Sequence, residues 1–111
     1  MTESIKRGAI ILCRFPTSET SVQSGMRPAV VLSNEKANAK SPVITVVPLT
    51  GADKKSLPVH TVIKSTVKKS IALAEQLTVV DVRSQVIKIL GAVTTKEMND
   101  LERAVKVQLA I

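Results

Sequence analysis

Six short apolar segments occupy the chain up to residue 93, and polar residues separate them. Each segment is rich in valine and isoleucine, and is bounded by proline, glycine, serine, asparagine or lysine. Such segments predict β-strands, at residues 8–15, 28–34, 42–49, 59–64, 70–80 and 84–93. Because the connections leave no room for βαβ crossovers, we expect a small, strongly bent antiparallel sheet or a partly open barrel.

The end of the chain has helical periodicity instead. Thr94 and Glu97 stand at the spacing of a capping box, the reciprocal side-chain to backbone pairing that begins many helices. Apolar residues then recur at helical spacing, at Met98, Leu101, Val105 and Leu109. The pattern predicts an amphipathic C-terminal helix that packs on the sheet.

Composition narrows the classes of protein. A length of 111 residues suits one domain, expected to span 1–111, and Phe15 is the only aromatic residue, so the core must be aliphatic. A single cysteine, Cys13, excludes an internal disulfide and indicates a buried residue in a reducing compartment. With one cysteine and one histidine the chain cannot build a standard metal site alone, and no cofactor is expected.

The N-terminus lacks a signal-peptide core and the apolar runs are too short to span a bilayer, which predicts a cytoplasmic protein without membrane contact.

The formal net charge is +7, and it is unevenly placed. The formal charges of residues 95–111 sum to zero, so residues 1–94 carry the whole positive excess. An excess of this kind either attracts a polyanion or keeps the protein soluble. Lysines at 54, 55, 64, 68 and 69 form either a basic binding face or a solvated surface.

Two polar loops, 16–26 and 51–58, are candidates for binding, with ordinary surface connections as the alternative. Arg27 follows the first loop and precedes Pro28, which restricts Arg27 to an extended backbone. A guanidinium held in this way is either a phosphate ligand or a plain surface charge. Thr50 ends an apolar run before Gly51, where its hydroxyl can bond a phosphate oxygen or cap the turn.

Three more polar residues stand near apolar segments. His60 is the only histidine, so the acid and base pair of a two-histidine nuclease is excluded, and a partly exposed strand position is expected. Glu75 and Gln76 interrupt an apolar run and need hydrogen-bond partners if they are buried.

In this order the segments resemble the MazF/PemK toxins of bacterial type II toxin–antitoxin systems. The resemblance runs from about Lys6 to Leu109 and rests on five segments. These are Arg7–Gly8, QSGMRPAVVLSN (23–34), VITVVPLTG (43–51), LPVH (57–60) and SIALAEQLTVVD (70–81). The chain departs from the family at Ala9, where an acid usually follows Arg-Gly, and at Val22, where the loop glutamate usually stands.

The resemblance implies an SH3-like small barrel, as in MazF and CcdB, that forms a homodimer and is neutralised by a MazE-like antitoxin peptide. It implies a sequence-specific, metal-independent endoribonuclease that cleaves single-stranded mRNA through its 2′-OH, leaving 2′,3′-cyclic phosphate and 5′-OH ends. It assigns catalysis to Arg27 and Thr50. The residues expected to bind RNA are Ser21, Gln23, Lys54, Lys55, His60 and Gln76, and the candidates for proton transfer are Glu19 and His60.

Two alternatives use the same fold without catalysis. One is an RNA-binding module, which is favoured by the absence of the family's usual acidic residues at Ala9 and Val22. The other is a CcdB-like gyrase poison, which relies on a C-terminal Trp-Gly-Ile, whereas this chain ends Gln-Leu-Ala-Ile and contains no tryptophan.

Overall fold

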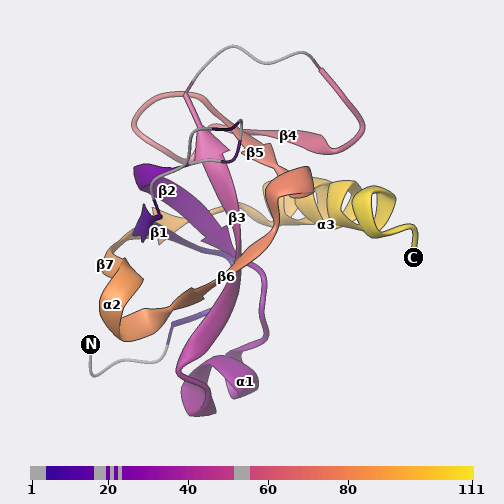
Figure 1. Ribbon diagram of the computed structural model, residues 1–111. Helices are drawn as coiled ribbons and strands as arrows, with labels where there is room; N and C mark the ends of the chain where they lie inside the picture. The colour runs from indigo at the N-terminus through magenta and orange to yellow at the C-terminus, as the bar shows by residue number, and fades with distance from the viewer. Residues whose placement is uncertain (1–4, 17–19, 21, 23, 52–55) are drawn as a thin grey trace.

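The computed structural model describes residues 5–16, 20, 22, 24–51 and 56–111. The strands are β1 (Ala9–Phe15), β2 (Gly25–Val31), β3 (Val43–Thr50), β4 (His60–Ile63), β5 (Ser70–Leu73), β6 (Thr78–Asp81) and β7 (Val86–Ala92). The helices are α1 (Glu35–Lys40), the 3₁₀ turn η1 (Ala74–Gln76), α2 (Val82–Gln85) and α3 (Thr95–Leu109). Figure 1 shows α3 extending to one side of the strands, and α1 at the far end of the molecule from β4 and β5.

The strands form one antiparallel sheet built around β3. Their order is β4-β5-β3-β2-β1-β7, and β6 also pairs with β3. The first half of β3 pairs with β6, and its last two residues pair with β5. Along its opposite edge, β3 pairs with β2. Because β4 and β7 are the two ends of this order, the sheet is open, as the bent antiparallel sheet expected from the sequence allows.

The segment predicted as one strand at 70–80 is two strands, and this is a correction. The 3₁₀ turn η1 separates them, so that β5 pairs with the end of β3 and β6 with its beginning. The turn forms at Ala-Glu-Gln, residue types with little preference for a pleated strand.

Two short helices, α1 and α2, stand between strands where the sequence pattern predicts strands and loops alone, and this is a correction. Each begins at a side-chain cap, because Asn34 accepts from Ala37 N and Asp81 accepts from Ser84 N. β2 also begins three residues earlier than predicted, at Gly25, so Arg27 lies inside the strand instead of before it.

Alternation along the strands divides the buried residues between two faces. On β1, Ile11 and Cys13 belong to one apolar cluster, whereas Ile10 belongs to a second cluster that includes Leu101 of α3. Cys13 is fully buried, as predicted, and burial raises the pKa of its thiol to about 12. The sheet is therefore packed on both sides near its centre, with α3 covering the second cluster.

The C-terminal helix confirms its predicted start. Thr94 accepts from Glu97 N, and the Glu97 side chain accepts from Thr94 N, which completes the capping box. Leu101 packs in the core, but Leu109 is 48% exposed, so the apolar stripe runs past the sheet. In the described ranges, no helix has the length and apolar character needed to cross a membrane.

Candidate active site

Arg27 is held by its own backbone turn. It is the third residue of β2, stands opposite Cys13 of β1 and is half-buried. Its Nε donates a hydrogen bond of 3.0 Å to the Ser24 carbonyl oxygen. Gly25 lies between them with φ +77°, a left-handed conformation that glycine adopts without strain. The bond at Nε sets the plane of the guanidinium and leaves its two terminal nitrogens without a hydrogen bond to any described residue.

Thr50 is the last residue of β3 and is buried, with 4% of its surface exposed. It pairs with Ile71 of β5, so the strand is supported up to the residue that carries the hydroxyl. The loop begins immediately afterwards, at Gly51. Thr50 is therefore fixed by the sheet at the edge of a loop.

Arg27 and Thr50 lie near the end of the observed pairing between β2 and β3. β2 and β3 pair Ala29 with Pro48 and Val30 with Val47. Carried two residues further, the same register sets Arg27 opposite Thr50, and opposite residues of an antiparallel pair share a face of the sheet. The observed pairing ends at Ala29 and Pro48, two residues short of Arg27 and Thr50 on each strand.

His60 occupies a partly exposed strand position, as predicted from the sequence. It begins β4, and its Nε2 lies 2.8 Å from Oε2 of Glu75 in η1. The side chains are 8% and 34% exposed. The contact joins β4 to η1 and gives the exposed Glu75 a polar partner. Gln76, the last residue of η1, is half-buried.

Five predicted site residues lie outside the described part of the chain. They are Glu19, Ser21, Gln23, Lys54 and Lys55.

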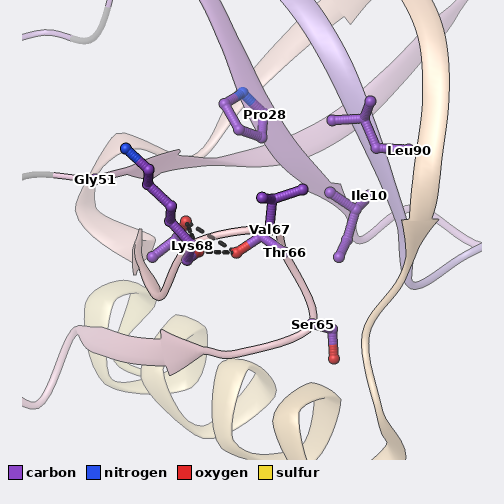
Figure 2. Close-up of a pocket in the computed structure, with 9 residues that line it drawn as sticks. Ile10, Pro28, Gly51, Ser65, Thr66, Val67, Lys68 and Leu90 are labelled. Atoms are coloured by element: carbon purple, nitrogen blue, oxygen red, sulfur yellow. Dashed lines mark hydrogen bonds between the residues drawn. The ribbon is translucent and has the colours of Figure 1, made fainter.

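A pocket of about 450 Å³ lies between strands β1, β2 and β7 and residues 65–70. Pro28 and Gly51, the residues that follow Arg27 and Thr50, both line it, together with Ile10 of β1 and Leu90 of β7. Its other wall is the β4–β5 loop (residues 64–69), with Ser70 beyond it (Figure 2). The sequence assigns Lys68 only to a basic face or a solvated surface, because no local pattern indicates that this loop folds back toward β1 and β2.

No three histidine, cysteine, aspartate or glutamate side chains gather as a metal site within the described ranges.

Comparisons with known proteins identify the family. Endoribonuclease MazF of Staphylococcus saprophyticus is 28% identical over 112 residues, which cover 96% of this chain and 92% of that protein. The crystal structure of MazF from Deinococcus radiodurans matches with a TM-score of 0.86 at 20% identity, covering 98% of this chain and 99% of that one. An endoribonuclease from mycobacterial species, in complex with its cognate antitoxin, matches with a TM-score of 0.80 at 20% identity and 97% coverage of each chain.

The structural matches confirm the expected MazF-like fold, an antiparallel sheet with a C-terminal helix. A family model described as a PemK-like, MazF-like toxin of type II toxin–antitoxin systems matches residues 6–109. Since this match spans nearly the whole chain, the protein belongs to the PemK-like, MazF-like toxin family.

Proposed function

We propose that this protein is the toxin of a type II toxin–antitoxin system and acts as an endoribonuclease on single-stranded RNA in the cytoplasm. The family and a relative named Endoribonuclease MazF support the reaction class. The observation that carries the proposal is the register of β2 and β3, which would set Arg27 opposite Thr50 if it continued two residues beyond the Ala29–Pro48 pair.

RNA supplies its own nucleophile, the 2′-OH next to the scissile phosphate. The 2′ oxygen attacks phosphorus, the bond from phosphorus to the 5′ oxygen breaks, and a 2′,3′-cyclic phosphate and a 5′-OH result. The 2′-OH loses its proton to a base, and the leaving oxygen gains one. Catalysis then consists of stabilising the negative charge on the pentacoordinate phosphorus while these protons move.

Arg27 suits this charge because its terminal nitrogens can donate two parallel hydrogen bonds to phosphate oxygens. Its orientation is already set by the bond from Nε to Ser24, so little freedom is lost when RNA binds. Thr50 adds a neutral donor from the facing strand. Donors fixed in advance contribute about 3 kcal/mol each to transition-state stabilisation.

Proton transfer is assigned to Glu19 or His60. The contact of His60 Nε2 with Glu75 occupies one ring nitrogen, and this favours a structural role for that imidazole. Glu19 precedes Arg27 in the loop 16–26, which makes it the other candidate in the absence of a glutamate at Val22.

RNA recognition is assigned to the two polar loops. Phe15, the only aromatic residue, is 5% exposed, so base stacking on an aromatic ring is not available to this protein. Bases must instead be bound through hydrogen bonds. We assign these contacts to Ser21, Gln23, Lys54, Lys55, His60 and Gln76.

The assembly is assigned as a homodimer. β7 is an end strand of the sheet, yet Ile87, Ile89 and Leu90 are 39%, 41% and 48% exposed on it. β7 pairs with β1 along one edge only, and an end strand that also exposes apolar side chains is a surface that monomeric proteins avoid. A second copy related by a two-fold axis would cover it.

The test is cleavage of a long single-stranded RNA by the purified protein, followed on a denaturing gel, with Arg27→Ala as the inactive control. Discrete cuts by the wild type alone support the proposal. Binding without cleavage would overturn it in favour of the RNA-binding alternative, and inhibition of gyrase without effect on RNA would favour the CcdB-like one.

A further inference from the structure

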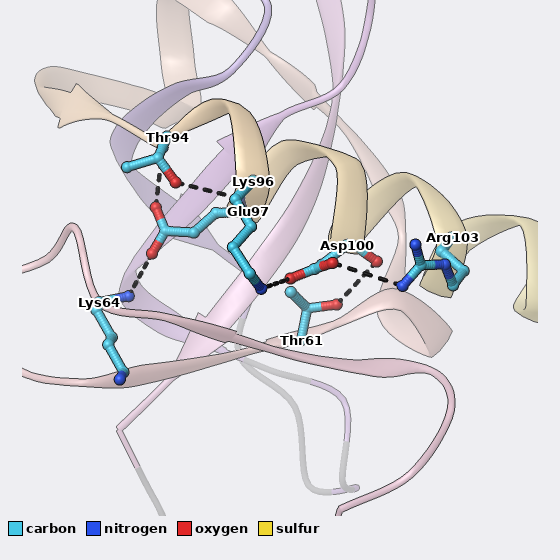
Figure 3. A network of polar contacts seen from close by, with 7 residues as sticks. All are labelled: Thr61, Lys64, Thr94, Lys96, Glu97, Asp100 and Arg103. Carbon is cyan, nitrogen blue, oxygen red and sulfur yellow. Dashed lines mark hydrogen bonds and ion pairs between the residues drawn. The ribbon is translucent and has the colours of Figure 1, made fainter.

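The strands β4 and β5 have one covered face and one open face. On the covered face, Ile63 and Ala72 pack in the apolar cluster that includes Leu101 of α3. Thr61 Oγ1 donates to the Asp100 carbonyl oxygen of the same helix at 3.3 Å, and Figure 3 shows the Thr61 side chain directed toward α3. Because side chains alternate along a strand, the residues between these on β4 and β5 belong to the face that turns away from α3.

Observed strand pairing places Thr50 on this open face. Thr50 of β3 stands opposite Ile71 of β5, and Ile71 stands opposite Val62 of β4. Opposite residues of an antiparallel pair share a face, so the three side chains form one row across three strands. Since neighbouring strands lie about 4.8 Å apart, Val62 lies about 10 Å from Thr50 along this row. Both pairings are observed at the residues themselves.

The row becomes more exposed with distance from Thr50. Thr50 is 4% exposed, Ile71 is half-buried and Val62 is 42% exposed. Val62 and Ile71 together make an aliphatic surface, the β4–β5 shelf, on the same face as one of the two residues assigned to catalysis. This position suits an apolar group of the substrate that is held next to the scissile phosphate.

A lysine borders the shelf. Lys64 directly follows β4, and its backbone N donates to Oε2 of Glu97 in the first turn of α3 at 2.6 Å. Figure 3 shows the Lys64 side chain extending away from Glu97 and from α3, in the direction of the open face. The side chain is exposed, while its backbone is fixed by the bond to the helix. The shelf therefore has a positive charge at its rim, which suits a polyanion better than a second copy of this basic chain.

A nucleobase has the chemistry that fits a surface of this kind. Hydrogen bonds read the edge of a base, whereas its flat face gains from burial against an apolar surface. Phe15, the only aromatic residue, is buried, so aliphatic side chains must serve that face here. We propose that the β4–β5 shelf holds one of the two nucleobases that flank the scissile phosphate, and that Lys64 contacts a backbone phosphate of the same strand. The inference rests on the proposed ribonuclease activity and adds a subsite to it.

The test measures the affinity of the protein for a short RNA that carries deoxyribose at the mapped cut and is not cleaved. Val62→Ser removes the exposed part of the shelf. Val43→Ser is its matched control, since Val43 is 41% exposed and lies at the other end of β3 from Thr50. Lys64→Ala removes the charge and keeps the backbone N–H. Its control is Lys36→Ala on α1, at the far end of the molecule from β4 and β5 (Figure 1).

We expect Val62→Ser to weaken RNA binding about three- to tenfold without changing its salt dependence, because the lost contact is apolar. Lys64→Ala should make the slope of log Kd against log salt concentration shallower by about 0.7, the value for one phosphate contact on a single strand. An abasic nucleotide at one side of the cut should cost a similar factor, and Val62→Ser should add nothing to that loss. Abasic nucleotides elsewhere should combine additively with Val62→Ser.

Additive losses at both nucleotides that flank the cut would overturn the inference, as would an equal effect of Val43→Ser. Unchanged RNA binding with weaker binding of the antitoxin segment would overturn it in favour of the antitoxin, and loss of the dimer in Val62→Ser would overturn it in favour of a second copy. If the wild type does not cleave RNA, the proposed function fails by itself. An abasic scan along an RNA that binds then tests the shelf through affinity alone.

Discussion

Arg27 of β2 and Thr50 of β3 occupy facing positions when the pairing of Ala29 with Pro48 is carried on by two residues. One side chain adds a fixed charge and the other a neutral donor. Both come from strands and not from loops, so their separation is set by the sheet. A site of this kind keeps its geometry when substrate leaves, which is the condition for charge stabilisation without reorganisation.

Removing either donor should therefore cost activity without unfolding the protein. We expect Arg27→Ala to lower kcat/KM about a hundredfold or more, the usual loss for one fixed donor to a transition state. Thr50→Ala should have a similar or milder effect, because the lost donor is neutral. Arg14→Ala is the matched control, since Arg14 is an exposed arginine of the neighbouring strand β1. Initial cleavage rates and thermal unfolding of each variant check this, and equal losses in Arg14→Ala would contradict it.

The nucleophile can be identified with a modified substrate. Replacing the single ribose on the 5′ side of the cut with deoxyribose should stop cleavage and leave binding nearly unchanged, because only the 2′-OH is lost. EDTA should not inhibit, because the proposed chemistry needs no metal. Mass analysis of the products should find a cyclic phosphate on one fragment and a 5′-OH on the other. Cleavage of the deoxy substrate at the normal rate would mean that water attacks, and the roles given to Arg27 and Thr50 would be wrong.

Much of the architecture follows from local pattern, and the site does not. Segments rich in valine and isoleucine predict most strands, and the capping box at Thr94 predicts the start of α3, because both effects act over a few residues. The register that sets Arg27 opposite Thr50 depends on pairing between distant strands. The second oxygen of Glu97 is likewise used by Lys64, 33 residues away, which no local pattern indicates.

The antitoxin should compete with RNA. Residues 1–94 carry the whole excess of +7, so an acidic peptide and a polyanion are drawn to the same part of the protein. An antitoxin segment that folds on binding would cover the two polar loops and exclude substrate. Fluorescence competition between a labelled non-cleavable RNA and the antitoxin's C-terminal segment should show mutual displacement. Simultaneous binding without loss of affinity would place the antitoxin elsewhere.

The exposed apolar side chains of β7 predict a dimer that one substitution can break. Wild type should sediment at micromolar concentration with about twice the chain mass of 11.9 kDa. Leu90→Glu should shift the protein toward monomer, because a carboxylate would be buried in the contact. Val79→Glu is the control, since Val79 is 56% exposed on β6, away from that strand. A dimer that persists in Leu90→Glu would show that another surface mediates assembly.

The hydrogen bonds to the Glu97 carboxylate predict how the stability of the fold depends on pH. Burial alone would raise the pKa of its carboxyl, but the bonds from Ser65, Thr94 and Lys64 outweigh burial and hold that pKa below its ordinary value. A carboxyl whose pKa is lower in the folded protein than in the unfolded chain stabilises the fold above the unfolded value, about 4.3. The contribution disappears as pH falls through the lower, folded value. Asp81 and Asp100 have pKa values that are also lowered by hydrogen bonds, from Ser84 and Lys96 respectively. They lose stabilising contacts in the same acid range.

The difference in melting temperature between wild type and Glu97→Gln isolates the contribution of one carboxyl from that of the others. We expect that difference in melting temperature to be constant from pH 7 to about pH 5 and to shrink below it, since glutamine does not titrate. Thermal unfolding between pH 3 and pH 7 measures it, with Glu102→Gln beside it. A difference that stays constant down to pH 3 would mean that the Glu97 carboxylate is not held by these donors.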